Sequence, residues 1–132
     1  GYDDIDFILN QKQLIEELIH PLVWKEVERR VQTSTASVCI VESALIYETK
    51  SEGRFTGVIV ATCSFGEQLR RLETHRKMSP EHAYARIITQ LPVSEKERHA
   101  QFIVNTECSY EDLVVRVERL YHTLMYEKGG EQ

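Results

Sequence analysis

The sequence contains few cysteines and no long apolar run, and both shortages restrict the class of protein. Its three cysteines are too few and too widely spaced for a zinc cluster or a disulfide framework. No apolar stretch is long enough to cross a membrane, and we expect no secretory signal. These features are typical of a protein of the reducing cytoplasm. Cys39 and Cys63 lie in apolar, strand-like runs, so we expect them to be core thiols.

Positive charge is scarce relative to negative charge. The 132 residues include 16 lysines and arginines against 21 aspartates and glutamates, which gives a formal net charge of -5. This balance argues against broad, nonspecific nucleic-acid binding, so we expect neither a nucleic acid nor a membrane as partner. Hydrophobic residues make up 42% of the chain, enough to build the core of one domain or of part of a larger one.

Residue groupings for metal binding or nucleophilic catalysis are also lacking. The histidines do not show metal-ligand spacing, and there is no evident Cys-His or Ser-His-Asp arrangement. The five histidines are His20, His75, His82, His99 and His122. We therefore assign no metal ligand and no catalytic residue from the residue types alone.

Three short apolar runs predict the strands of a sheet. The first, Val38–Val41, has the unbroken apolar character of a strand that is covered on both faces. Gly57–Cys63 and Gln101–Thr106 are the second and third. Strands that alternate with helices indicate an α/β protein with a parallel sheet. The polar stretch after the first run, Glu42–Glu48, lies where open α/β sheets bind their ligands.

Helices are predicted before, between and after these strands. Capping serines are expected at Ser79, Ser94 and Ser109. In the helix that follows the second strand, Arg70 and Arg71 are expected to face solvent. The predicted helices are Gln11–Ile19, Pro21–Gln32, Phe65–Thr74, Ser79–Gln90, Ser94–Ala100 and a last one from Ser109 through Leu124.

Five short segments form a characteristic series. They are Ile19–Val23 (a His-Pro helix start), Val41–Glu48 (a strand end with an acidic loop), Ser79–Gln90 (a capped helix containing Ala85-Arg86-Ile87), Glu95-Lys96 and Ala100–Thr106 (a strand). In this order they resemble the dephospho-coenzyme A kinase family of P-loop kinases. The resemblance extends from about Ile8 to Leu124, nearly the whole chain.

The resemblance implies a fold and an activity. The family transfers the terminal phosphoryl group of ATP, with magnesium, to the ribose 3′-hydroxyl of dephospho-coenzyme A, in coenzyme A biosynthesis. The chain would then be the C-terminal portion of a three-layer P-loop kinase-like fold, with ATP and dephospho-coenzyme A as its ligands. Its regions would be a helical acceptor-side segment (1–34), core strands and a helix (35–75), lid-like helices (76–100), and a last strand with the C-terminal helix (101–132).

The resemblance also implies two sets of site residues. The lid over the phosphates of ATP would contain Arg86, Arg76 and Gln90. The side of the acceptor substrate would contain His20, Glu48 and Glu42. From the residues alone, Arg86 also suits a solvated helix face, and His20 suits a helix start whose ring is satisfied by the backbone. The two glutamates also suit ordinary strand-end carboxylates.

Departures from the family pattern concern the lid and the phosphate-binding loop. His75-Arg76 stands where the family has an Arg-Asp pair, so Arg76 either replaces that arginine with a one-residue shift or leaves a weaker clamp. The sequence contains no Gly-x-x-x-x-Gly-Lys-Ser/Thr run, the loop that holds phosphates and magnesium. We therefore expect this chain alone to be inactive. It is either a portion of a longer dephospho-coenzyme A kinase-like protein, or a non-catalytic nucleotide-binding or interaction domain derived from the same fold.

The same departure implies a missing strand. In the fold that the chain resembles, a central strand separates the strands matched by Val38–Val41 and Gly57–Thr62. We expect a segment that precedes Gly1 to supply it. A gap of roughly 9–10 Å, two strand spacings, is then expected between Ile40 and Ile59. Without that segment, the chain would pair with a second copy, bring these two strands together, or not fold alone.

Overall fold

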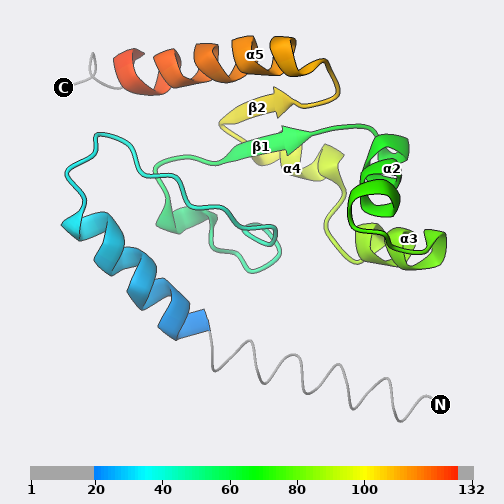
Figure 1. The fold of residues 1–132 in the computed structure, drawn as a ribbon. Helices are drawn as coiled ribbons and strands as arrows, with labels where there is room; N and C mark the ends of the chain where they lie inside the picture. Colours follow the sequence, from blue (N-terminus) through cyan, green and yellow to red (C-terminus); the bar gives the residue numbers. More distant parts are fainter. Residues whose placement is uncertain (1–19, 128–132) are drawn as a thin grey trace. The chain divides into compact units, whose positions relative to one another are not determined.

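The computed structural model describes residues 20–127, so the helix predicted over Gln11–Ile19 lies outside the described residues. The chain divides into two compact units, Gly1–Glu42 and Ser43–Gln132. Figure 1 shows the first as a helix with an irregular continuation, and the second as strands and helices in alternation.

The described part of the first unit begins with a helix. Residues 20–33 are helical, in agreement with the helix predicted from Pro21 to Gln32. The carboxylate of Glu26 pairs with Arg29 and Arg30, one turn farther along the same helix. These hydrogen bonds, the one from Arg29 foremost, lower the pKa of Glu26 to about 2. Such pairs at three- and four-residue spacing stabilise a solvent-exposed helix modestly.

The segment from Val38 to Val41 is not a strand, contrary to the prediction. Ile40 is 68% exposed, and Cys39 is exposed, so Cys39 is not a core thiol. A strand requires a ladder of hydrogen bonds to a neighbour, and among residues 20–127 the one ladder joins two other segments. The run thus has the composition of a buried strand without a partner strand. The spacing between Ile40 and Ile59 stays a prediction, because these residues belong to different units.

The second unit contains two strands separated by three helices. The strands are β1 (Ile59–Thr62) and β2 (Phe102–Asn105), which confirms the second and third predicted strands. The helices and helical turns are η1 (Glu52–Arg54), α2 (Phe65–His75), α3 (Pro80–Ile88), α4 (Val93–His99), α5 (Tyr110–His122) and the π-helical turn η2 (Thr123–Glu127). Each predicted helix after the second strand is present, although α3 ends two residues before Gln90.

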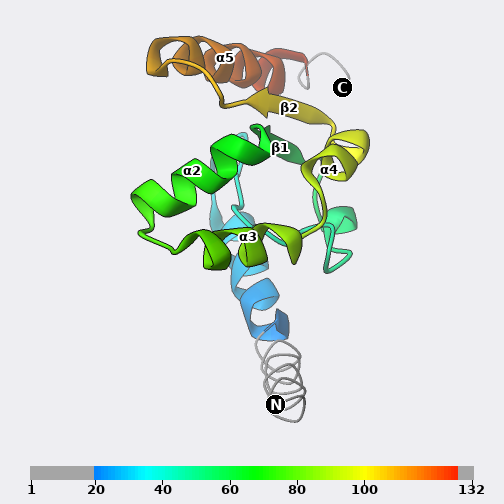
Figure 2. The same ribbon diagram turned by 90° about the vertical axis from the view of Figure 1, so that its right-hand side faces the viewer.

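β1 and β2 form a parallel pair in which Ile59 is opposite Phe102 and Thr62 is opposite Asn105. The connection between them consists of α2, α3 and α4. In Figure 1 and Figure 2, α5 runs alongside β2, and α2 and α3 lie side by side. The buried apolar residues of the described chain are Val58, Val60, Ala83 and Val104. A parallel sheet with flanking helices confirms the predicted fold class.

Serine caps fix the starts of α2, α3 and α5. The hydroxyls of Ser64, Ser79 and Ser109 each accept a hydrogen bond from the amide three residues later, at 3.2, 3.2 and 3.1 Å. Such a bond satisfies one of the free amides at a helix start. The caps at Ser79 and Ser109 are those that the sequence predicts.

Ser94 does not cap α4, contrary to the prediction. The helix begins at Val93, and Pro92 occupies the cap position without a side-chain hydrogen bond. The carbonyl of Pro92 already accepts from the amides of Glu95 and Lys96. Because the first turn closes onto Pro92, Ser94 lies inside the helix, where its hydroxyl has no free first-turn amide to cap.

Candidate functional site

A cavity of about 470 Å³ lies at the carboxyl end of β1. Cys63, which directly follows the last residue of β1, forms part of its wall. The lining residues come from this strand end, the first turns of α2, the end of α3 and the start of α4. They are Cys63, Phe65, Gln68, Ile87, Ile88, Gln90, Leu91, Pro92, Val93, Ser94 and Lys96. Open α/β sheets bind ligands at the carboxyl ends of their strands, so this cavity is the candidate site.

The cavity wall is mainly apolar with a few polar groups. Its polar side chains include the amides of Gln68 and Gln90 and the ammonium of Lys96. The Gln68 amide nitrogen donates to the carbonyl oxygen of Cys63 at 3.4 Å, which places this side chain across the end of β1. Apolar walls with a few polar groups are typical of small-molecule sites.

Lys96 reaches the cavity from α4 and is held from behind by Glu48. Its Nζ lies 3.1 Å from Oε2 of Glu48 and donates to the carbonyl oxygen of Ala44 at 3.1 Å. The same Glu48 oxygen accepts the amide hydrogen of Leu91 at 3.2 Å. Two residues of the cavity wall, Leu91 and Lys96, are therefore fixed by one carboxylate.

A second polar network joins α2 to Thr106, the residue that follows β2. Arg71 donates to the hydroxyl of Thr106 at 2.8 Å and to its carbonyl oxygen at 3.0 Å. Arg71 is therefore half-buried and engaged with β2, contrary to the prediction that it faces solvent, whereas Arg70 is exposed as predicted. Glu67 accepts hydrogen bonds from both arginines, and the one from Arg70 is the main cause that lowers the pKa of Glu67 to about 2.

Cys63 contributes a neutral thiol to the cavity. Burial is the main cause that raises the pKa of this thiol, so the protonated form predominates at neutral pH. Because the thiolate is the reactive form of cysteine, Cys63 is a wall residue and not an activated nucleophile.

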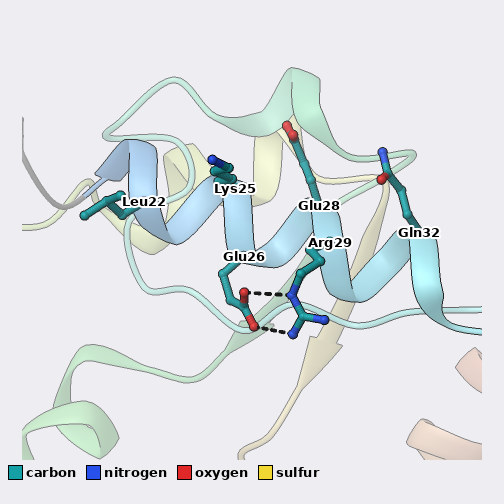
Figure 3. Close-up of a pocket in the computed structure, with 6 residues that line it drawn as sticks. All are labelled: Leu22, Lys25, Glu26, Glu28, Arg29 and Gln32. Carbon is teal, nitrogen blue, oxygen red and sulfur yellow. Dashed lines mark hydrogen bonds and ion pairs between the residues drawn. The ribbon is translucent and has the colours of Figure 1, made fainter.

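A smaller hollow of about 350 Å³ lies along the helix of residues 20–33, and its described lining comes from that helix alone. Figure 3 shows Glu26 and Arg29 pointing toward each other and joined by two hydrogen bonds, at 2.7 and 3.0 Å. The other lining residues are Leu22, Lys25, Glu28 and Gln32. None of the predicted site residues lines this hollow, and its Glu26 carboxylate is already neutralised, so we prefer the cavity at β1.

Comparison with known proteins identifies the family. The dephospho-CoA kinase family (CoaE) matches residues 8–112, most of the chain. The chain belongs to the dephospho-CoA kinase family. A dephospho-CoA kinase of Bdellovibrio bacteriovorus is 29% identical to it over 109 residues, which are 80% of this chain and 54% of the relative. A dephospho-CoA kinase of Brucella melitensis is 31% identical over 102 residues, 75% of this chain and 51% of the relative.

A solved structure, that of TT1252 from Thermus thermophilus, has a similar fold. It superposes with a TM-score of 0.73 at 26% identity, over 86% of this chain and 59% of that one. The family match confirms the resemblance seen in the sequence. The chain spans about half the length of the curated dephospho-CoA kinases described above.

In this member of the dephospho-CoA kinase family, the predicted lid residues lie at different places on and just beyond α2 and α3. Gln90 lines the cavity, just past the end of α3. Arg86 is exposed in the last turn of α3, and its guanidinium makes no hydrogen bond or ion pair with another described residue. Arg76 is exposed at the C-cap of α2. Of the three, only Gln90 is among the described lining residues.

The predicted acceptor-side residues divide between the two units. His20 and Glu42 belong to the first unit, and Glu48 belongs to the second. Glu48 is half-buried and meets the cavity wall through Leu91 and Lys96. Nothing in the residue pattern pairs Lys96 with Glu48, and the Glu95-Lys96 motif is the signal that marks Lys96.

Residues 20–127 contain neither a metal-ligand cluster nor a membrane-spanning helix. Over residues 20–127, no three histidine, cysteine, aspartate or glutamate side chains gather as a metal site would require. No helix in that range combines the length and apolar composition needed to span a bilayer.

Proposed function

We propose that this chain supplies the lid, the acceptor-side helix and the C-terminal portion of a dephospho-CoA kinase. That enzyme phosphorylates the ribose 3′-hydroxyl of dephospho-CoA with ATP, a step of coenzyme A biosynthesis that we place in the cytoplasm. Family membership supports this assignment. Because the chain spans about half of its relatives, the proposal concerns a portion of the catalytic unit.

The observation that carries the proposal is that the guanidinium of Arg86 is exposed and has no partner among the described residues. This side chain is exposed and unpaired within residues 20–127, while many other arginines there hold a carboxylate or carbonyl group. It lies on α3, and the chain just beyond α3 walls the cavity at the carboxyl end of β1. Phosphoryl transfer depends on positive charge placed around the phosphates, and an uncommitted guanidinium suits that task.

The residues of this chain would bind and orient the substrates. Arg86 and Arg76 would bind the phosphates of ATP from the lid, and the amide of Gln90 would donate to the same ligand from the cavity wall. His20, Glu42 and Glu48 would lie on the dephospho-CoA side. Magnesium, when bound, neutralises phosphate charge. The described residues form no ligand set for it. The loop whose lysine would bind the phosphates and whose hydroxyl would bind magnesium is absent from the sequence.

ATP binding and phosphoryl transfer test the proposal separately. We expect the chain to transfer no phosphate from ATP to dephospho-CoA above background, since the loss of such positioning groups commonly costs several powers of ten in rate. ATP binding, measured by calorimetry, should be weakened about tenfold in Arg86→Ala, the loss expected of one charged contact. Arg98→Ala is the matched control, because Arg98 is an exposed arginine of α4 paired with Glu95. Equal binding by wild type and Arg86→Ala would exclude Arg86 from the lid.

A second candidate is a non-catalytic nucleotide-binding or interaction domain derived from the same fold. The absence of the Gly-x-x-x-x-Gly-Lys-Ser/Thr run favours it. Sequencing the encoding gene upstream of the Gly1 codon separates the two: an in-frame phosphate-binding loop supports the kinase portion, and its absence supports the second candidate. Turnover that scales with this chain and disappears in Arg86→Ala would contradict both.

A further inference from the structure

Glu48 and Lys96 form a long-range ion pair that is mostly buried. Their side chains are 20% and 14% exposed, and the charged atoms are 3.1 Å apart. In the pairs of Glu26, Glu67 and Glu95, by contrast, the arginine is at least 36% exposed and lies three or four residues from the glutamate. The Glu48–Lys96 pair therefore differs from these local surface pairs in both burial and reach.

The pair joins three segments of the second unit. Glu48 Oε2 accepts from Lys96 Nζ and from the amide of Leu91, 43 residues away in the sequence. Lys96 Nζ also donates to the carbonyl oxygen of Ala44. The turn at 44–48 is thus tied to the α3–α4 connection through Leu91, and to α4 through Lys96. Leu91 and Lys96 both line the cavity, so the pair lies directly behind its wall.

Stability alone is a poor explanation for this pair. Replacing a buried ion pair with apolar residues of similar volume is often neutral or stabilising, because two charges must lose their water. Glu48 Oε1 and the hydroxyl of Tyr47 are moreover buried without a hydrogen-bond partner among the described residues. The pair instead orients the groups around it, because it holds the amide of Leu91 and the ammonium of Lys96 on a single oxygen of Glu48.

α3 has few other attachments. Its one buried residue is Ala83, near its start. Tyr84 contacts the ring of Phe65 edge-on, with ring centres 5.9 Å apart. Ile88, at the C-terminal end of the helix, is 57% exposed. Apart from packing on α2, this end of α3 is held by the half-buried Ile87 in the cavity wall. Just beyond it, the bond from the amide of Leu91 to Glu48 adds a polar attachment.

We propose that Glu48 is a positioning residue that holds the base of the lid. Through Leu91 and Lys96 it fixes the end of α3, and with it Arg86 and Gln90, relative to β1. In this role Glu48 acts through Leu91 and Lys96, and not by touching a phosphate or a reacting atom. The inference rests on the proposed function only in treating α3 as a lid; the attachment itself is independent of the substrate.

Amide hydrogen exchange in the full chain tests the attachment without any ligand. In Glu48→Ala, we expect the amides of Leu91 and of residues 86–90 to exchange at least tenfold faster relative to those of Val60 and Val104. The ratio matters because a residue that only stabilises the fold would accelerate exchange in the strands and in α3 by the same factor. An unchanged ratio would overturn the proposal.

Two further variants separate the contacts. In Glu48→Gln, the side-chain oxygen can still accept from Leu91 but carries no charge for Lys96. We expect exchange at Leu91 to stay within about threefold of wild type, while modification of Lys96 by an amine reagent becomes severalfold faster. An unchanged Lys96 reactivity would overturn the proposal even if Glu48→Ala does not fold. Glu95→Ala is the control, because it removes an exposed pair on the same helix and should change neither readout.

ATP titration of the same samples keeps this inference distinct from the proposed function. Slower exchange of residues 86–90 on adding ATP to wild type, but not to Glu48→Ala, would support both. If ATP has no effect on wild type while the Glu48→Ala ratio changes as expected, the attachment stands and the role of α3 as an ATP lid falls.

Discussion

Ser64 and Glu107 are joined by two hydrogen bonds. The main-chain amide of Ser64 donates to Oε2 of Glu107 at 2.9 Å, and the hydroxyl of Ser64 donates to Oε1 at 3.0 Å. The same hydroxyl accepts the amide hydrogen of Glu67 at the start of α2. One serine therefore caps a helix and binds the loop after β1 to the loop after β2.

Replacing Ser64 should cost more stability than replacing the other capping serines. Loss of a serine cap typically lowers the free energy of unfolding by about 1 kcal/mol. Ser64→Ala also removes a hydrogen bond to a charged oxygen, worth roughly 1.5–3 kcal/mol before solvent exposure reduces it. Urea unfolding should thus show a larger loss for Ser64→Ala than for Ser79→Ala or Ser109→Ala. The excess should vanish in a Glu107→Ala background, and equal losses for the three serines would count against the contact.

Lys77 should be replaceable by glycine with a gain in stability. Its φ of 52° lies in the left-handed region, between α2 and α3. A side chain in that region costs roughly 1–2 kcal/mol, which glycine avoids at the expense of a more flexible unfolded chain. We expect Lys77→Gly to raise the free energy of unfolding by about 0.5–1 kcal/mol. Arg76→Gly, next to it at a φ of -102°, should instead lower it. A loss for both variants would show that Lys77 is not strained.

The titration of Glu67 should depend on Arg70. The pKa of this carboxyl lies near 2, below its usual value of 4.5, chiefly because of the hydrogen bond from Arg70. A carboxyl whose pKa is lower in the folded state stabilises the fold above pH 4.5 and loses that effect as the pH falls toward 2. In Arg70→Gln, NMR titration should show a higher pKa for Glu67, still below 4.5 because Arg71 remains. Glu26, paired with other arginines, should titrate unchanged.

Proline substitution should distinguish the two edges of β1. The carbonyl oxygens of Val58 and Thr62 accept from the amides of Phe102 and Thr106. In a parallel ladder, alternate residues direct their main-chain groups to the same neighbour, so Val60 also faces β2 and Ala61 faces the other edge. Val60→Pro should lower the free energy of unfolding by about 1–3 kcal/mol more than Ala61→Pro, because it leaves a carbonyl of β2 unpaired. Loss of the buried Val60 side chain adds to this difference.

The same pair of variants reports on the proposed missing strand. If a second copy of the chain, or a segment outside this sequence, pairs with the open edge, Ala61→Pro will also leave a carbonyl unpaired, and its cost will rise by about 1–3 kcal/mol. A loss close to that of Val60→Pro would therefore reveal an occupied edge. Sedimentation of wild type and Ala61→Pro then shows whether the occupant is a second copy.

Features that depend on neighbouring residues could be predicted from the sequence better than contacts between residues far apart in the chain. The caps at Ser79 and Ser109 depend on residues within one turn, and both were visible in the sequence. The prediction of a cap at Ser94 was wrong, because Pro92, two residues earlier, occupies the cap position of the same helix. The hydrogen bond of Glu48 to Leu91 and that of Arg71 to Thr106 span 43 and 35 residues, and no periodicity carries such information.

The prediction that Val38–Val41 is a strand was wrong for a related reason. Its composition suits a buried strand, but composition does not name the partner that a ladder requires. β1 and β2 have comparable apolar runs, and they became strands because each has the other as its neighbour. Apolar composition thus identified which segments could be strands, and pairing decided which of them are.

The parallel register of β1 and β2 has a consequence for the order of folding. Gln101 binds the amide of Val58, Thr106 binds the carbonyl of Thr62, and Glu107 binds Ser64, contacts that span 43 or 44 residues. The ladder can close only after this intervening chain has been drawn into a loop, an entropic cost met before any contact is gained. During synthesis, the second unit therefore has no strand pair until Phe102 and the residues after it have left the ribosome. Until then, β1 is an uncharged, unpaired strand, the state in which a chain is most open to aggregation.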